Sequence, residues 1–105
     1  MPELPRPFRR FLSRYPAVEK AHMELSLAVN REGPLDERAR RLVRLGIAIG
    51  QQSPGAVKSH VRRALEEGLT ADEVRHAALL ALPTLGFPPM VAALEWVEAV
   101  LEEGP

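Results

Sequence analysis

The sequence predicts an all-α protein: a single-domain, six-helix bundle spanning residues 1–105. No stretch alternates apolar and polar residues as a half-buried strand would. Apolar residues instead recur every three to four positions, as on one face of a helix. Proline, glycine and helix-capping residues divide the chain into segments of helical length. A chain of 105 residues suits one domain with a modest core.

The first two predicted helices occupy the N-terminal third of the chain. A short helix is expected over residues 8–15, and Pro16 suits the first turn of the next one. That second helix runs to about Arg31 and ends before Gly33 and Pro34. Its apolar stripe consists of Val18, Ala21, Leu25, Ala28 and Val29.

The third predicted helix begins at Asp36, a good capping residue, and reaches about Gly50. One face carries Leu35, Ala39, Leu42, Gly46 and Ile49. Because every residue from 45 to 49 is apolar or glycine, we expect this half of the helix to be buried on all sides.

Ser53 and Pro54 predict the start of the fourth helix, with serine as the N-cap and proline in the first helical position. The helix runs to Glu67, and Gly68 terminates it. Its inward residues are expected to be Val57, Val61, Ala64 and Leu65.

Thr70 and Glu73 have the spacing of a capping box and predict the start of the fifth helix, which Pro83 interrupts. Its inward residues are expected to be Val74, Ala77, Ala78, Ala81 and Leu82. The last helix covers about residues 89–103. Its expected inner face is Val91, Leu94, Val97 and Leu101.

Composition excludes several classes of function. Fourteen basic and fourteen acidic residues cancel and aromatic residues are few, which disfavours nucleic-acid binding. The absence of cysteine excludes a disulfide framework, a thiolate metal site and a redox dithiol within this chain. The first twelve residues lack the apolar core of a signal peptide, so we expect a cytoplasmic protein.

The longest uncharged run, residues 77–94, resembles a membrane span only in length. Pro83, Gly86, Pro88 and Pro89 interrupt it, and a spanning helix needs continuous hydrogen bonding. We therefore expect two buried helix segments around a tight loop, and no membrane association. Such a run also exceeds what one small core can hide, which predicts a homo-oligomer.

His60 is the first candidate for chemistry, since it lies between two inward valines. It is either a buried neutral imidazole with one partner or a proton-transfer group tuned by partial burial. Its candidate carboxylate partners are Glu66, Glu67 and Glu73.

The other two histidines give weaker signals. His76 follows Asp72 by four residues, a spacing that allows a surface pair or an accessory acid. His22 has no evident partner. No metal site is expected, because no two histidines have the spacing of ligands on one helix.

Arg38 and Arg41 lie at the margins of the apolar face of the third helix. An arginine in such a place pairs with a neighbouring helix, or holds a substrate carboxylate through two parallel hydrogen bonds.

Residues 35–101 resemble the carboxymuconolactone decarboxylase-like family, which includes the alkyl hydroperoxidase D-like proteins. The resemblance rests on LDERARRLVRLGIAIG, on SHVRRALEEGLTADEV over residues 59–74, and on GFP at residues 86–88. It implies an all-helical bundle of the alkyl hydroperoxidase D-like type, with residues 1–34 as N-terminal helices. It also implies assembly into trimers or hexamers.

The redox branch of that family has a C-x-x-C motif before the motif histidine and a glutamate one helix earlier. By this resemblance the two cysteine positions fall on Ser53 and Ala56, the glutamate falls on Arg41, and the histidine is His60. The peroxiredoxin-type activity that the family label implies therefore lacks its thiols here.

The decarboxylase branch lacks these cysteines too. Loss of CO2 from a carboxylated lactone needs a cation to orient the carboxylate and an acid to protonate the carbanion. Arg41 and His60 are the candidates, with His76 and Arg38 as accessory residues. Three functions stay open, all without a cofactor: lyase-type chemistry on a small carboxylated molecule, a non-catalytic oligomeric binding or interaction module, and peroxidase activity with a partner's cysteine.

Overall fold

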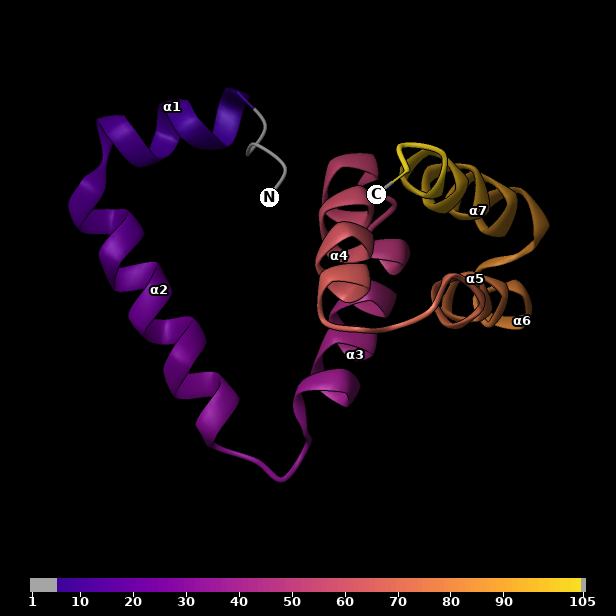
Figure 1. Ribbon diagram of the computed structural model, residues 1–105, viewed down its shortest axis with the longest axis horizontal. Helices are drawn as coiled ribbons and strands as arrows, with labels where there is room; N and C mark the ends of the chain where they lie inside the picture. The colour runs from indigo at the N-terminus through magenta and orange to yellow at the C-terminus, as the bar shows by residue number, and fades with distance from the viewer. Residues whose placement is uncertain (1–5, 105) are drawn as a thin grey trace. The chain divides into compact units, whose positions relative to one another are not determined.

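The computed structural model describes residues 6–104, which are helical and contain no strand (Figure 1). The helices are α1 (Arg6–Arg14), α2 (Pro16–Arg31), α3 (Glu37–Gly50), α4 (Pro54–Glu66), α5 (Ala71–Leu79), α6 (Leu82–Leu85) and α7 (Phe87–Leu101). The all-α prediction is confirmed. Six helices are expected from the sequence, and the seventh, α6, is a four-residue segment.

The chain divides into two compact units at the junction of Pro34 and Leu35. The N-terminal unit contains α1 and α2, whose junction brings the rings of Phe11 and Tyr15 to a centroid distance of 5.6 Å. No residue of either helix is buried. The apolar stripe of α2 is therefore present but open in this single chain, and Leu25 keeps 60% of its surface exposed.

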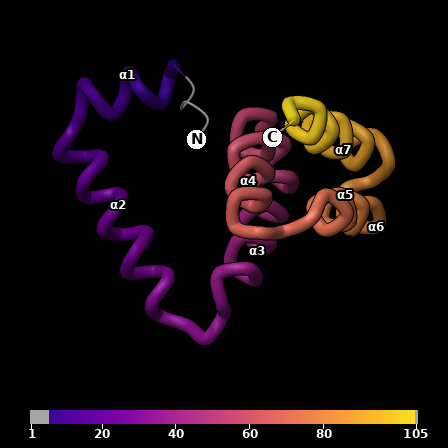
Figure 2. The backbone as a smooth tube through the Cα atoms, viewed as in Figure 1, coloured from indigo at the N-terminus to yellow at the C-terminus, as the bar shows by residue number. Residues whose placement is uncertain are grey.

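In the C-terminal unit, α4 packs against α3 and α7, and α5 packs against the same two helices. The tube in Figure 2 follows this path from α3 to the C-terminus. No helix within residues 6–104 is long and apolar enough to cross a membrane. The uncharged run at 77–94 is instead divided among α5, α6 and α7.

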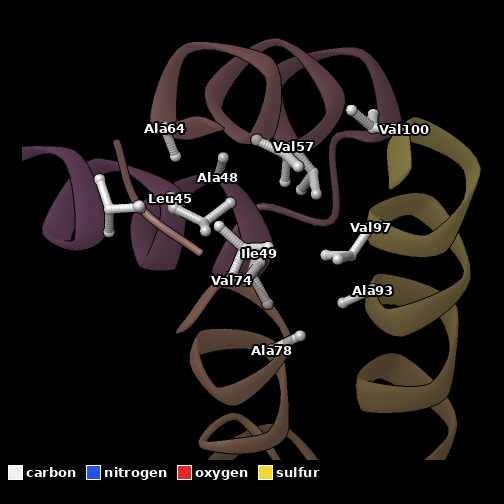
Figure 3. Close-up of a cluster of buried hydrophobic side chains, with 12 residues drawn as sticks. Leu45, Ala48, Ile49, Val57, Ala64, Val74, Ala78, Ala93, Val97 and Val100 are labelled. Carbon is white, nitrogen blue, oxygen red and sulfur yellow. The ribbon is translucent and has the colours of Figure 1, made fainter. Parts of the chain in front are cut away.

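Small aliphatic side chains from four helices form the core (Figure 3). The buried cluster consists of Leu45, Ala48, Ile49, Val57, Val61, Ala64, Leu69, Val74, Ala78, Ala93, Val97 and Val100. The inner faces predicted for α4 and α5 are confirmed at their central positions. Valine and alanine let the helices approach closely while losing little side-chain entropy on burial.

Two predicted faces are wrong in part. The second half of α3 is not buried on all sides: Ile47 is 57% exposed, because α4 and α5 cover only one side of the helix. In α7 the predicted Val97 is buried and Leu94 and Leu101 pack against the core, but Val91 is 37% exposed. The other buried residues of this helix are Met90, Ala93 and Val100. Because apolar residues lie on most sides of α7, periodicity does not select the face that meets the core.

The helix ends follow the capping signals with one exception. The Asp36 carboxylate accepts a hydrogen bond from the Ala39 amide at 2.9 Å. Gly68 ends α4 in the left-handed region, at φ +94°. Ser53 occupies the N-cap position of α4, but its hydroxyl makes no capping hydrogen bond there.

The capping box of α5 is complete. Thr70 Oγ1 accepts from the Glu73 amide at 3.1 Å, and Glu73 Oε1 accepts from the Thr70 amide at 2.9 Å. Thr70→Ala should therefore lower the free energy of unfolding by about 1 kcal/mol. Ser53→Ala is the matched control and should change it by less than about 0.5 kcal/mol. Urea unfolding of the three proteins measures both values, and equal losses in the two variants would contradict this account of the caps.

Candidate functional site

Arg41 of α3 joins the two residues on which the site depends, His60 in α4 and Glu67 just after it. Its Nε and Nη2 donate to the two carboxylate oxygens of Glu67, each at 2.9 Å. Its Nη1 lies 2.8 Å from Nδ1 of His60. The Arg41 side chain is 12% exposed and that of Glu67 is 21% exposed. The structure therefore brings Arg41 and His60 together, and adds Glu67 as the carboxylate that compensates the buried guanidinium.

The Arg41 contact fixes the tautomer of His60. A guanidinium has only N–H donors, so Nδ1 of His60 must accept the hydrogen bond. A neutral imidazole with Nδ1 as acceptor carries its proton on Nε2. No described residue accepts a hydrogen bond from this Nε2–H, which leaves one directed donor in the half-buried site.

His60 is neutral at pH 7. Burial, and after it the positive charges of Arg41, Arg63 and Arg44, lower its pKa to about 4, whereas Glu67 opposes this shift. The hydrogen bonds from Arg41 hold the pKa of Glu67 below its usual value. The arrangement consequently favours His60 as a hydrogen-bond donor over the proton-donating acid expected from the sequence.

Arg38 does not reach this cluster. Its Nη2 pairs with Glu73 Oε2 at 2.5 Å, next to the capping box of α5. Glu73 is therefore paired with Arg38 and not with His60. Of the three candidate carboxylates, Glu67 is the one that is linked to His60, because Arg41 contacts both residues.

His76 is exposed on α5 and makes no side-chain hydrogen bond to a described residue. Asp72 pairs instead with Arg75, at 3.4 Å. The Asp72–His76 pair that the spacing allows is not formed, and His76 is a surface residue. Arg75 reaches the Asp72 carboxylate instead and also bonds Glu98 of α7 at 2.6 Å.

A cavity of about 380 Å³ opens between α3 on one side and α5 with α6 on the other. Its walls are mostly apolar, and Glu73, His76 and Thr84 supply the polar groups. His60 does not line it. The sequence reasoning missed this cavity, for which the available signal was the spacing of Gly46 and Gly50 by one helical turn.

Ser53 and Ala56 lie in the N-cap and first turn of α4, one to two turns before His60 on the same helix. Neither side chain carries a thiol. Within residues 6–104, no three His, Cys, Asp or Glu side chains lie together as a metal site.

Comparison with known proteins decides the family. The sequence profile of the Carboxymuconolactone decarboxylase family matches residues 16–99, most of the chain. The chain belongs to this family. The match begins at the start of α2, earlier than the resemblance that begins at residue 35, so α2 is part of the family's common region.

Two known proteins are similar to this chain. "Uncharacterized protein 4 in cox locus" of Paracoccus denitrificans is 31% identical over 65 residues, which make up 62% of this chain and 59% of that protein. The chain thus matches less than two thirds of that relative's length. The apo crystal structure of a carboxymuconolactone decarboxylase family protein from Legionella pneumophila shares the fold, with a TM-score of 0.75 at 24% identity. The match covers 90% of this chain and 85% of that one.

The lowered pKa of His60 predicts a pH dependence of stability. Between pH 6.5 and about 4 the unfolded chain binds a proton at residue 60 that the folded chain does not. The free energy of unfolding should therefore fall as the pH is lowered through this range. His60→Gln removes this contribution, so the variant should lose less stability, by on the order of 1–2 kcal/mol after allowance for solvent screening.

Urea unfolding of both proteins at pH 7 and pH 4 measures this difference. Glu67 and the other carboxylates titrate in both proteins, so the difference between the two losses reports His60 together with its effect on Glu67. Parallel loss of stability in the two proteins would show that His60 is not held neutral by its surroundings.

Proposed function

We propose that this chain binds a small carboxylated molecule at the Arg41–His60–Glu67 cluster and acts on it by cofactor-free, lyase-type chemistry. The observation that carries the proposal is the Nε2–H of His60, a fixed donor with no described acceptor. The guanidinium of Arg41, next to this donor, is a cation that would attract an anionic ligand.

The chemistry follows from what each group can still do. Arg41 uses three of its five N–H donors on Glu67 and His60, which leaves two for a substrate carboxylate. When the bond to CO2 breaks, its electron pair stays on the substrate carbon and delocalises onto an adjacent carbonyl oxygen. A neutral imidazole N–H stabilises such an oxyanion without giving up its proton. In this proposal water supplies the proton to the carbon.

A non-catalytic oligomeric module is the second candidate, favoured by a different observation. The described cavity does not reach His60, and apolar side chains of α2 and α3 are exposed in the single chain. Peroxidase activity, the third function that the family label implies, needs a thiol from another protein, because this sequence has no cysteine.

Turnover of carboxylated lactones by the parent and two variants tests the role of His60. His60→Leu removes the donor and should lower kcat/KM by about 10²–10³-fold. His60→Gln retains an N–H donor and should keep part of the activity. His22→Gln on α2 is the matched control and should leave kcat/KM unchanged.

Equal losses in the two His60 variants would indicate proton transfer by the histidine and contradict the donor role. Binding of the carboxylates without turnover, measured by calorimetry, would favour the non-catalytic module.

We further propose that the chain forms a homo-oligomer, a trimer or a hexamer, through the exposed apolar side chains of α2. Leu25→Glu places a charge on that stripe and should reduce the mass measured by light scattering at micromolar concentration. Glu24→Gln, on the same helix, is the control and should leave the mass unchanged. A monomeric parent protein would refute this proposal.

A further inference from the structure

The proposed function does not use the cavity between α3 and α5–α6. Leu42, Gly46, Ile49 and Gly50 line it from one face of α3. Ala77, Leu80, Ala81 and Leu85 line it from the facing side, and the cavity is open to solvent there, since Leu80 is 63% exposed. A volume of about 380 Å³ lies within the range of small-molecule pockets, which are mostly apolar with a few polar groups.

Two glycines of α3, Gly46 and Gly50, contribute no side chain to the cavity that they line. Glycine inside a helix is less favourable than alanine. A Cβ built on Gly46 or on Gly50 meets no atom within 4 Å, so packing in this chain does not require glycine at either position. Both residues face the cavity, one turn apart, where any side chain would occupy its volume.

The polar groups at the wall define the chemistry of the occupant. The charge of Glu73 is matched by Arg38, at 2.5 Å, so the wall offers no unbalanced charge from this pair to attract an ion. Each Glu73 oxygen already accepts one hydrogen bond and has capacity for a further one. The Thr84 hydroxyl and the His76 ring add groups that bond a hydroxyl on a ligand.

We propose that this cavity is a binding site for a small, neutral, mainly apolar molecule that carries a hydroxyl group. None of Arg41, His60 and Glu67 lines this cavity, so the binding proposal does not depend on the proposed lyase chemistry. The apolar walls take the body of the ligand, and Glu73, His76 and Thr84 take its hydroxyl.

Titration of the full-length protein with cyclohexanol, benzyl alcohol and 2-phenylethanol, followed by amide NMR shifts, tests the site. Gly46→Leu fills the cavity and should weaken binding of these alcohols by about tenfold or more. Gly55→Leu is the matched control: its Cβ also meets no atom within 4 Å, it lies in the first turn of α4 outside the cavity, and binding should persist. Thr84→Val should weaken the alcohols but not toluene, which lacks the hydroxyl.

Three results would overturn the proposal. The first is that none of the three alcohols shifts the amide signals of cavity residues, and the second is that the Gly46→Leu variant binds the alcohols as tightly as the parent. The third is that the Gly46→Leu variant has a smaller particle mass than the parent in light scattering. The last result would assign the cavity to a second copy of the chain. The His60→Leu variant, which should lose lyase activity, should still bind the alcohols as the parent does. The two proposals can therefore be tested separately.

Discussion

The ion pair between Arg41 and Glu67 is the interaction on which the candidate site depends. A guanidinium that is 12% exposed needs a carboxylate with matched geometry, and Glu67 supplies both oxygens at 2.9 Å. The pair links the middle of α3 to the end of α4. With Arg41 held by Glu67, its Nη1 lies 2.8 Å from Nδ1 of His60, and this contact sets the tautomer of the imidazole. Burial, together with the charge of Arg41, keeps the ring neutral.

The resemblance to the redox branch allows the surroundings of His60 to be compared with those of the motif histidine in that branch. That branch has a glutamate where this chain has Arg41, and two cysteines where it has Ser53 and Ala56. The carboxylate has not been lost from the surroundings of the histidine, since Glu67 supplies it from another position. It now meets the histidine through a cation, however, and a cation lowers the proton affinity of the ring. The same helical scaffold therefore presents a hydrogen-bond donor in place of a proton relay.

Local signals in the sequence account for most of the fold. The helix boundaries at Pro16, Asp36, Gly68 and Thr70 follow from backbone chemistry that acts within one turn, and the family resemblance adds the bundle type. Side-chain partners were harder to predict. The face of α7 that meets the core and the exposed side of Ile47 depend on which helices are adjacent. Arg75 bonds both Asp72 on its own helix and Glu98 on α7, and the second contact depends on which helix is adjacent to α5.

Glu73 serves three structural elements at once: it caps α5, it pairs with Arg38 of α3, and it lines the cavity. Few substitutions of Glu73 should be tolerated, because a change that alters the cavity wall also removes the capping hydrogen bond at the start of α5. Thr84 and His76 carry no such second task among the described residues. We therefore expect relatives that differ in the preferred occupant of this cavity to have diverged at those two positions, while the acidic residue at the helix start is retained.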